Sequence, residues 1–368
     1  MGKNIAIVTF WDSQDNYGQV MQAYSLCRYI SSLGHNPYII KYRYREPRNL
    51  KYYLKRHYIF MMEVKSFLQN PSGYMRSKRI KRQHDGYCRG FDAFRANHIP
   101  MTDMVYDQVE LKSNPPQADL YISGSDQIWS LLDPIYFLQF ASDEKTCLAI
   151  GPSCGGRMFS EAEREILRRF LQRYQFIGLR ENRDRELISG LGYQEAKTVV
   201  DPTLLLTADD YNRIAGSTQT KGNYILVYLI SNKFDLEMNQ IYDFAQGHHL
   251  EVKYVASQGR YDYYEKVYPT PEEWLGLVRD ATHVVTNSFH GTVFSLLYNR
   301  SFTVIPQKGS SKRMNTRIVD LLRPLGLENR IFNGDMQVFD TIIDYDKVNS
   351  ILNEFVNKSI KEINKYLE

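Results

Sequence analysis

The stretch Thr282-His-Val-Val-Thr-Asn-Ser-Phe-His-Gly-Thr-Val-Phe-Ser-Leu-Leu-Tyr298 decides the fold. It opens with a β-branched run over residues 282–286, which is typical of a buried strand, and the apolar spacing after His290 predicts a helix. Ser288 stands where a helix N-cap belongs, because its hydroxyl can accept from a backbone N–H two or three residues on. A helix N-terminus that follows a strand favours a bound anion, since its free N–H groups and its dipole both attract negative charge. We therefore expect an α/β protein with an anion site at this point.

Two residues in the first turn of this helix could serve such a site. His290 can donate, accept or transfer a proton near neutral pH. Gly291 leaves room for a ligand to approach the backbone. The competing interpretation is a capped helix that carries a surface histidine, and the local sequence alone favours it. The rest of the chain has to decide between the two.

The size and composition of the chain bound its class. Its 368 residues suggest two domains. No run approaches the roughly 20 apolar residues of a membrane span, and the N-terminus has too short an apolar core for a signal peptide. The four cysteines form no CxxC pair, which predicts free thiols, a reducing cytoplasm and no metal site. No GxGxxG follows an expected strand, the P-loop and HExxH motifs are absent from the sequence, and Gly124-Ser125-Asp126 does not fit the GxSxG motif.

Charge is unevenly distributed. The net charge is only +4, yet residues 41–95 hold 15 lysines and arginines against four acidic residues, with tyrosines interleaved. This segment could be a solvated basic face, which is the plainest interpretation. Nucleic acid is disfavoured because no recognition motif accompanies the charge. The third interpretation is an anionic membrane surface or a lipid-linked diphosphate, for which tyrosine is suited by its apolar body and polar tip.

Strands and helices alternate along the chain, which predicts parallel sheets. We predict an N-terminal Rossmann-like domain over residues 1–214 with the basic, tyrosine-rich insertion at 45–95. A polar linker follows at 215–223, and then a second Rossmann-like domain at 224–343. The terminal amphipathic segment, 344–368, is predicted to form a helix that packs back on the first domain.

The expected strands are 4–10, 38–42, 119–123, 146–150, 176–179, 198–201, 224–230, 251–255, 282–286 and 302–306. The expected helices include one that ends near Leu33, and others at 58–68, 161–174, 182–189, 236–246, 271–280, 315–325 and 345–367.

Polar residues follow several of these strands, where parallel sheets place their ligands. They are Asp15, Asn16 and Gly18 after the first strand, Gly124-Ser-Asp-Gln-Ile-Trp129 after the third, Arg180-Glu-Asn182, Asp201, and Asn287, Ser288 and His290. If the two sheet edges that carry these polar residues face each other, they form a cleft between the domains, and such clefts are favoured places for a ligand.

The side-chain chemistry points to a small, doubly anionic ligand. Arg180 offers a rigid fork of donors suited to a carboxylate or phosphate, although a surface salt bridge is the competing interpretation. His290 and Asp126 are the best acid–base candidates, although an Asp in a turn commonly bonds its own backbone. More cations follow a later strand, namely Lys312, Arg313 and Arg317.

Several motifs in this order resemble the polysaccharide pyruvyl transferase family. They are Asn16-Tyr-Gly-Gln-Val-Met-Gln-Ala-Tyr-Ser-Leu26, Gly124-Ser-Asp-Gln-Ile-Trp129, Leu179-Arg-Glu181, Val200-Asp-Pro-Thr-Leu-Leu205, Asn287-Ser-Phe-His-Gly-Thr-Val-Phe294 and Asn315-Thr-Arg-Ile-Val-Asp-Leu-Leu322. The resemblance implies two Rossmann-like domains in a GT-B-like arrangement. It also implies an enzyme that moves pyruvate from phosphoenolpyruvate onto two hydroxyls of a sugar as a cyclic ketal, releasing phosphate. Such sugars belong to capsules, exopolysaccharides and cell-wall glycans, and no cofactor is expected to be obligatory.

The resemblance and the chemistry together give a predicted site. The expected catalytic residues are His290, Asp126 and Arg180, and the expected substrate-binding residues are Asn16, Gly18, Gln22, Ser125, Gln127, Asn287, Ser288, Gly291, Lys312, Arg313 and Arg317. One departure stands out: some family members have Arg-Leu-His where this chain has Ser288-Phe289-His290. Arg313 or Arg317 would have to supply that charge, and Arg317 fits the family pattern better.

Two other functions stay open at this point. One is a nucleotide-sugar glycosyltransferase on the same GT-B architecture, since fold does not fix function. The other is a non-catalytic glycan- or membrane-binding module built on residues 45–95.

For the transferase we expect a hexose acceptor such as galactose, bridged as a 4,6-ketal and possibly linked to a lipid diphosphate. The protein would then work in the cytoplasm, with peripheral contact at the inner face of the plasma membrane.

Overall fold

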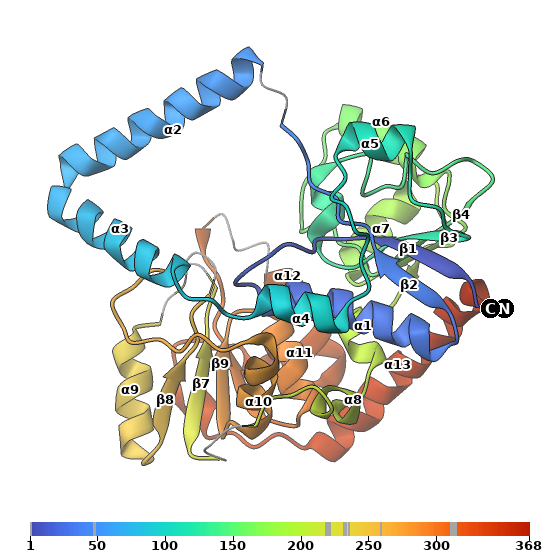
Figure 1. The fold of residues 1–368 in the computed structure, drawn as a ribbon. Helices are drawn as coiled ribbons and strands as arrows, with labels where there is room; N and C mark the ends of the chain where they lie inside the picture. Colours follow the sequence, from blue (N-terminus) through green and yellow to red (C-terminus); the bar gives the residue numbers. More distant parts are fainter. Residues whose placement is uncertain are drawn as a thin grey trace.

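The computed structural model describes residues 2–46, 49–217, 222–230, 234, 236–257, 260–309 and 315–368. It contains two parallel β-sheets with helices packed against them (Figure 1). The six-stranded sheet has the order β2-β1-β3-β4-β5-β6, with β1 Asn4–Val8, β2 Asn36–Ile39, β3 Leu120–Ser123, β4 Thr146–Ile150, β5 Phe176–Leu179 and β6 Lys197–Thr198. The four-stranded sheet has the order β10-β9-β7-β8, with β7 Tyr224–Tyr228, β8 Glu251–Tyr254, β9 His283–Thr286 and β10 Ser301–Val304.

The two sheets reverse their strand order in the same way. In the first, β1 pairs with β2 on one side and with β3 on the other, with Ile5 opposite Pro37 and Leu120. In the second, β7 stands between β8 and β9. A sheet of this kind leaves a crevice at the carboxyl ends of the two strands where the order reverses. Each sheet therefore has one such crevice, after β1 and β3 and after β7 and β9.

Helices connect the strands. They are α1 Tyr17–Ser32, α2 Leu50–Gln69, α3 Pro71–Asp85, α4 Phe91–His98, α5 Gln108–Ser113, α6 Glu161–Leu171, α7 Asn182–Gly190, α8 Ala208–Asn212, α9 Met238–Gly247, α10 Pro271–Asp280, α11 Phe289–Leu297, α12 Asn315–Leu322 and α13 Tyr345–Leu367. Short 3₁₀ turns include η1 Gln127–Leu131, η2 Pro202–Leu205 and η4 Arg323–Leu325. Among the helices of the described residues, none is both long enough and apolar enough to cross a bilayer.

Alternation of side chains along the strands divides the interior into three cores. Ile5 and Ile7 of β1 face a central core, and Ala6 and Val8 face an outer core on the other side of the first sheet. The second sheet does the same, with Leu226 in the central core and its neighbours in a third core. The central core is continuous from β1 to β9. The two α/β units thus share buried surface rather than meeting only at their rims.

The helix α13 joins the two units. At its start, the hydroxyl of Tyr345 donates to the carbonyl of Arg300 in the second unit. Farther along, Ser359 Oγ accepts from the backbone N–H of Val200 at 3.0 Å, and Tyr29 donates to Asn364 at 2.6 Å. The C-terminal helix therefore lies against the first sheet unit, close to the N-terminus (Figure 1).

Most differences from the expected elements are at their ends, as with β1, which stops at Val8. Some are larger. The helix expected at 58–68 is the C-terminal part of the longer α2. The helix α3 was not expected, because its charged sequence lacks an apolar period, and neither were the short helices α4, α5 and α8. Asn70 separates the two helices: its N–H donates to Ser66 O, and its side chain caps α3 just before Pro71. The strand expected at 198–201 ends at Thr198, because Asp201 caps η2 instead.

Candidate functional site

The crevice of the first sheet holds Ser125 and Asp126. The hydroxyl of Thr9, just past β1, donates to the carbonyl of Ser125 at 2.7 Å and ties the two loops together. Asp126 caps η1 and accepts from the N–H of Gln127 at 2.8 Å, so the interpretation as a turn aspartate holds in part. Its backbone has φ 78° and ψ −178°, a region that is essentially reserved for glycine. Such strain in a non-glycine residue marks a position that the surrounding structure holds in place.

Asp201 lies at the centre of the site, and its side chain is fully buried. One carboxylate oxygen forms an ion pair with Arg180 and accepts from Ser125 Oγ at 2.9 Å. The other accepts from the N–H and hydroxyl of Thr203. Burial alone would raise the pKa of Asp201, but Arg180 and then His290 hold it well below its usual range. Asp201 is therefore an anion at neutral pH and orients groups from both sheet units.

Two arginines share this buried region. The guanidinium carbons of Arg180 and Arg317 lie 5.0 and 5.7 Å from the ring centre of Phe289. Burial lowers the pKa of Arg317, and repulsion from Arg180 lowers it further. Arg180 is not a surface ion pair, because its side chain is only 2% exposed. Its Nε and Nη2 have no hydrogen-bond partner, so part of its donor fork is available to a ligand.

Gln127 lies next to the second arginine. With the amide oxygen turned toward Arg317, it would accept from both terminal guanidinium nitrogens at 3.1 Å. The oxygen and nitrogen of such an amide are assigned from their neighbours, and donors surround this position. The contact links η1, after β3, to α12.

His290 faces the first unit from the first turn of α11. Its Nε2 lies 3.7 Å from Asp201 Oδ2, and the residue is buried, so it is not a surface histidine. On its other side is Gly18 in α1, where an added Cβ would lie 2.1 Å from His290 Nδ1. Gly18 thus lets α1 approach the histidine directly, and the two residues bring together the crevices of the two sheets.

Glu181 is a second buried carboxyl group beside Arg180. Its Oε1 lies 3.8 Å from Arg180 Nη2, and neither carboxyl oxygen has a hydrogen-bond partner. Burial raises the pKa of Glu181 to about 8, although Arg180 acts in the opposite direction, and nearby Asp184 raises it again. The group therefore holds a proton at neutral pH within the candidate site.

The replacement Glu181→Gln tests this assignment through stability. The pKa of a glutamate in the unfolded chain is 4.5, whereas the pKa of Glu181 in the folded chain is about 8. Between these values the folded chain binds more protons, so rising pH lowers the free energy of unfolding. Glu181→Gln removes that loss. The free energy of unfolding of the variant minus that of the native chain should therefore rise with pH, by at most about 1.4 kcal/mol per pH unit. The difference should level off above pH 8. Urea denaturation between pH 5 and about 9 measures it.

The exposed Glu144 offers a matched control. Glu144→Gln should change the free energy of unfolding by no more than about 0.5 kcal/mol throughout the same interval, because substitutions of exposed side chains cost little. A pH-independent difference for Glu181→Gln would contradict a raised pKa for Glu181.

Other predicted residues have contacts that build the scaffold. Asn16 caps α1, and Ser288 caps α11 by accepting from Gly291 N at 3.3 Å. The amide of Asn287 bonds both backbone groups of Ile230, at 2.7 and 2.8 Å, and so closes the crevice of the second sheet. The amide nitrogen of Gln22 donates to Thr9 Oγ1 at 3.1 Å and to two backbone carbonyls.

Gly291 has a packing role. An added Cβ there would lie 2.4 Å from Thr286 Oγ1, so the space on this side of the glycine is filled by the strand that precedes the helix. The glycine therefore permits close packing of α11 on β9. Two further predicted residues, Lys312 and Arg313, lie outside the described residues.

A cavity of about 280 Å³ opens beside the two arginines. Its polar lining includes Arg180, Glu181, Asp201 and Arg317, and its apolar lining comes from Phe289, Leu204, Leu325, Leu352 and Phe355. It therefore lies where the first unit, η4 and α13 meet. His290, Asp126 and Gln127 are not among its lining residues, so Arg180, Asp201 and Phe289 stand between the cavity and the histidine.

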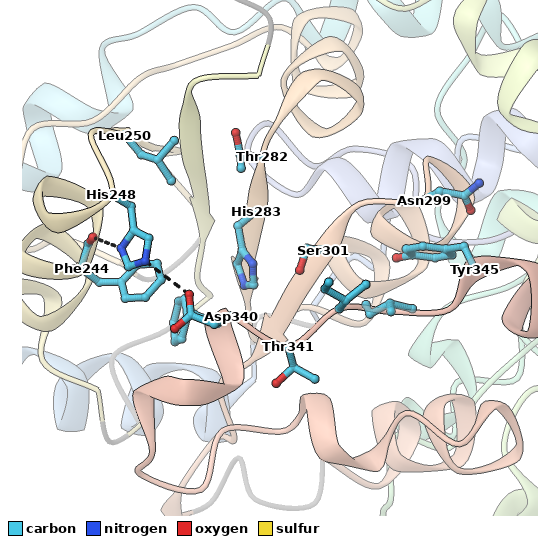
Figure 2. A pocket seen from close by; sticks show the side chains of 13 residues that line it. Phe244, His248, Leu250, Thr282, His283, Asn299, Ser301, Asp340, Thr341 and Tyr345 are labelled. Atoms are coloured by element: carbon cyan, nitrogen blue, oxygen red, sulfur yellow. Dashed lines mark hydrogen bonds and ion pairs between the residues drawn. The ribbon is translucent and has the colours of Figure 1, made fainter.

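A second cavity, of about 350 Å³, lies elsewhere (Figure 2). Its lining includes Thr282, His283 and Ser301, at the amino ends of β9 and β10. In Figure 2, His248 points toward Asp340, with 3.3 Å between Nε2 and Oδ1. Parallel sheets place their ligands at the opposite, carboxyl edge. This cavity is therefore a less suitable place for the reaction than the one beside Arg180.

The structure thus adds three residues to the predicted site: Asp201, Glu181 and Phe289. All three stand in motifs already noted in the sequence, Leu179-Arg-Glu181, Val200-Asp-Pro-Thr-Leu-Leu205 and Asn287-Ser-Phe-His-Gly-Thr-Val-Phe294. The position of Asp201 at the end of an expected strand was a usable signal. That Phe289 would lie beside both arginines could not be read from the sequence, because Arg180 and Arg317 belong to different units.

Comparisons with known proteins concern both the fold and the family of the chain. Among solved structures, the UDP-N-acetylglucosamine 2-epimerase from Rickettsia bellii matches with a TM-score of 0.50 and 11% identity, over 100% of this chain and 97% of that chain. The UDP-GlcNAc 2-epimerase from Methanocaldococcus jannaschii matches with a TM-score of 0.46 and 8% identity, over 96% and 92%. The calicheamicin glycosyltransferase CalG4 matches with a TM-score of 0.41 and 11% identity, over 100% and 98%.

At such identities the likeness to the first of these concerns the fold alone, which is that of two Rossmann-like domains in a GT-B-like arrangement. A search of curated proteins finds no match to the sequence. The family model described as polysaccharide pyruvyl transferase matches residues 16–309, a span that contains Asp126, Arg180, Asp201 and His290. The chain therefore belongs to the polysaccharide pyruvyl transferase family.

Proposed function

We propose that this protein transfers pyruvate from phosphoenolpyruvate onto two hydroxyls of a hexose as a cyclic ketal and releases phosphate. The product would be a precursor of a capsule, an exopolysaccharide or a cell-wall glycan. The observation that carries the proposal is the pair of arginines beside Phe289, of which Arg180 is buried and Arg317 partly buried. Two guanidinium groups that repel each other in a buried site are stabilised by an anionic ligand. Phosphoenolpyruvate offers one carboxylate and one phosphate to two such groups.

The chemistry requires a proton on carbon and two deprotonated hydroxyls. A proton added to the methylene carbon makes it a methyl group and leaves the central carbon electron-poor. One sugar hydroxyl attacks that carbon and loses its proton, the carbon–oxygen bond to phosphate breaks, and the second hydroxyl closes the ring. The sugar hydroxyls release two protons. One replaces the proton that was added to form the methyl group, and the other leaves on phosphate. Carbon protonation and hydroxyl deprotonation thus need groups that exchange protons near neutral pH.

The site offers groups for each part of this reaction. Arg180 and Arg317 would hold the anionic groups of the donor, and electrostatic stabilisation would supply much of the rate enhancement. His290, oriented by Asp201, would transfer protons at the reacting carbon or the sugar hydroxyl. Glu181 would hold a proton beside Arg180, and Asp126 would accept from the acceptor sugar.

Phosphate release from phosphoenolpyruvate tests the proposal directly. It should depend on an acceptor when galactosides and N-acetylhexosaminides are supplied in turn, and the product should be heavier by one pyruvate ketal in mass spectrometry. Consumption of a nucleotide sugar without any phosphate release from phosphoenolpyruvate would favour the glycosyltransferase alternative and contradict the proposal.

A matched pair of variants tests where phosphoenolpyruvate binds. Arg317 in α12 is partly buried, whereas Arg323 in the adjoining η4 has a side chain that is 64% exposed. Arg317→Gln should raise the KM for phosphoenolpyruvate about tenfold or more, as expected for a lost charged contact. Arg323→Gln should leave that KM unchanged. Equal values for both variants would remove Arg317 from the donor site.

A further inference from the structure

The helices α2 and α3 form an arm: α2 stands away from both sheets, and α3 leads back to the second unit, where its buried His84 packs against Tyr261 and Tyr268 (Figure 1). Except for Tyr52 and Val64, every described side chain of α2 is exposed. Several of these side chains are large and apolar, including Leu68 at 71%, Tyr58 at 65% and Leu54 at 58%. Scattered apolar side chains are normal on a surface, but a contiguous apolar patch usually marks an interaction site.

The apolar residues of α2 gather on one side. At 3.6 residues per turn, Leu54, Met61 and Leu68 recur every seven positions and lie in one stripe, flanked by Phe60 and Phe67. The opposite side carries Lys55, Glu63, Ser66 and Gln69, together with Ile59 and Met62. Such a helix has one face suited to an apolar environment and one suited to water.

Charge decides between the possible partners. Residues 49–85 contain nine lysines and arginines but only two acidic residues, Glu63 and Asp85. A second copy of the chain would bring two strongly positive arms together, and like charges repel. A bilayer with anionic lipids offers both an apolar layer for the stripe and negative headgroups for the basic residues. Interleaved tyrosines such as Tyr53 and Tyr58 suit the boundary between the two.

The arm is attached to both units at the carboxyl edge of their sheets, the edge at which the candidate site also lies. Before α2, the backbone N–H of Arg43 donates to Tyr106 O at 2.9 Å, just past β2 in the first unit. After α3, Arg89 Nη1 donates to Ala256 O at 3.1 Å, just past β8 in the second unit. Both attachment points follow the carboxyl ends of strands. A surface bound by the arm would therefore lie on the side of the molecule to which the cleft residues belong.

We propose that α2 and α3 dock the protein onto an anionic lipid bilayer, with the stripe of Leu54, Met61 and Leu68 inserted at the headgroup boundary. Docking in this way would bring the cleft to an acceptor sugar carried on a membrane lipid. That purpose rests on the proposed transfer reaction, whereas the binding itself does not.

Vesicle co-sedimentation of the full chain, without phosphoenolpyruvate or sugar, tests the binding. Vesicles of phosphatidylcholine with an equal amount of phosphatidylglycerol should bind the native protein, and vesicles of phosphatidylcholine alone should bind it much less. Higher salt should weaken the binding, because exposed charges are screened. Equal or absent binding to the two vesicle types would overturn the proposal.

A pair of variants separates the two faces of the helix. Leu54→Gln, Met61→Gln and Leu68→Gln combined should lower partitioning onto the anionic vesicles at least about tenfold, since three apolar side chains no longer insert. Ile59→Gln with Met62→Gln, on the other face and similarly exposed at 50% and 48%, should stay within about twofold of the native protein. Glutamine retains helix propensity and charge, and circular dichroism checks that the helix persists.

Two outcomes would reject the lipid partner. Native-like vesicle binding by the triple variant would show that the stripe does not insert. A native chain that sediments as a dimer in the absence of lipid, and a triple variant that sediments as a monomer, would assign the stripe to a second copy of the chain. Neither result depends on catalysis, so failure here is distinct from failure of the proposed function.

Discussion

Replacement of Asp201 by asparagine is expected to lower the free energy of unfolding by about 3–5 kcal/mol, the usual cost of leaving a buried charge without its partner. The exchange keeps the size of the side chain but removes the negative charge opposite Arg180, which is almost completely buried. It also places an amide NH₂ at one of the two oxygen positions, of which one now accepts from Ser125 and the other from Thr203. Urea denaturation with an unchanged m-value would measure the loss.

A control for this effect is Asp143→Asn. Asp143 is exposed in the loop before β4, so the same exchange should change stability by no more than about 0.5 kcal/mol. If Asp201→Asn were as mild, Arg180 would have to find another partner in the folded chain, and Asp201 would lose its place as the orienting anion of the site.

The largest effect on rate is expected for His290→Gln. Glutamine can form hydrogen bonds but cannot exchange a proton near neutral pH, so kcat for phosphate release should fall about 10²–10⁴-fold. The KM for phosphoenolpyruvate should change little, because Arg180 and Arg317 would still hold the anionic groups. Steady-state kinetics with the identified acceptor separates the two constants.

His248→Gln is the matched control for the histidine. His248 belongs to the same unit, but it lies in α9's terminal turn by the second cavity, with its side chain 47% exposed (Figure 2). Its replacement should leave both constants unchanged. Should His290→Gln retain kcat within a few-fold, the proton transfer would pass to another group, and Glu181 would be the first to examine.

Much of the architecture follows from sequence pattern because its signals are local. The helices expected at 161–174 and 271–280 begin where α6 and α10 do, and the structure shows a local capping box at each start, Ser160 with Glu163 and Thr270 with Glu273. The amphipathic period of 345–367 correctly predicts α13. Strand ends were less predictable, because Asp201 and its neighbours form a capped turn where β-branched residues alone suggest a continued strand.

The site is only partly predictable because its decisive contacts are not local. Residues at strand ends, such as Asp126 and His290, are found by topology, since parallel strands bring their carboxyl ends to one edge. The link between them is Asp201, and it requires knowing how the two units meet. The same holds for Gly18 and Gly291: each glycine is needed, but only the structure shows that one admits a histidine and the other admits a strand.

The helix α13 has a mechanical consequence. Two domains joined by a single flexible linker can rotate relative to each other, and many proteins with a cleft between domains move in this way. Here the chain crosses between the units near residue 215 and again along α13, and Arg89, between α3 and α4, forms a further hydrogen bond with the second unit. Each extra connection restricts the rotation of one unit relative to the other. The spacing between Asp201 and His290 is thus set before any ligand arrives, and less of a ligand's binding energy is lost in bringing them together.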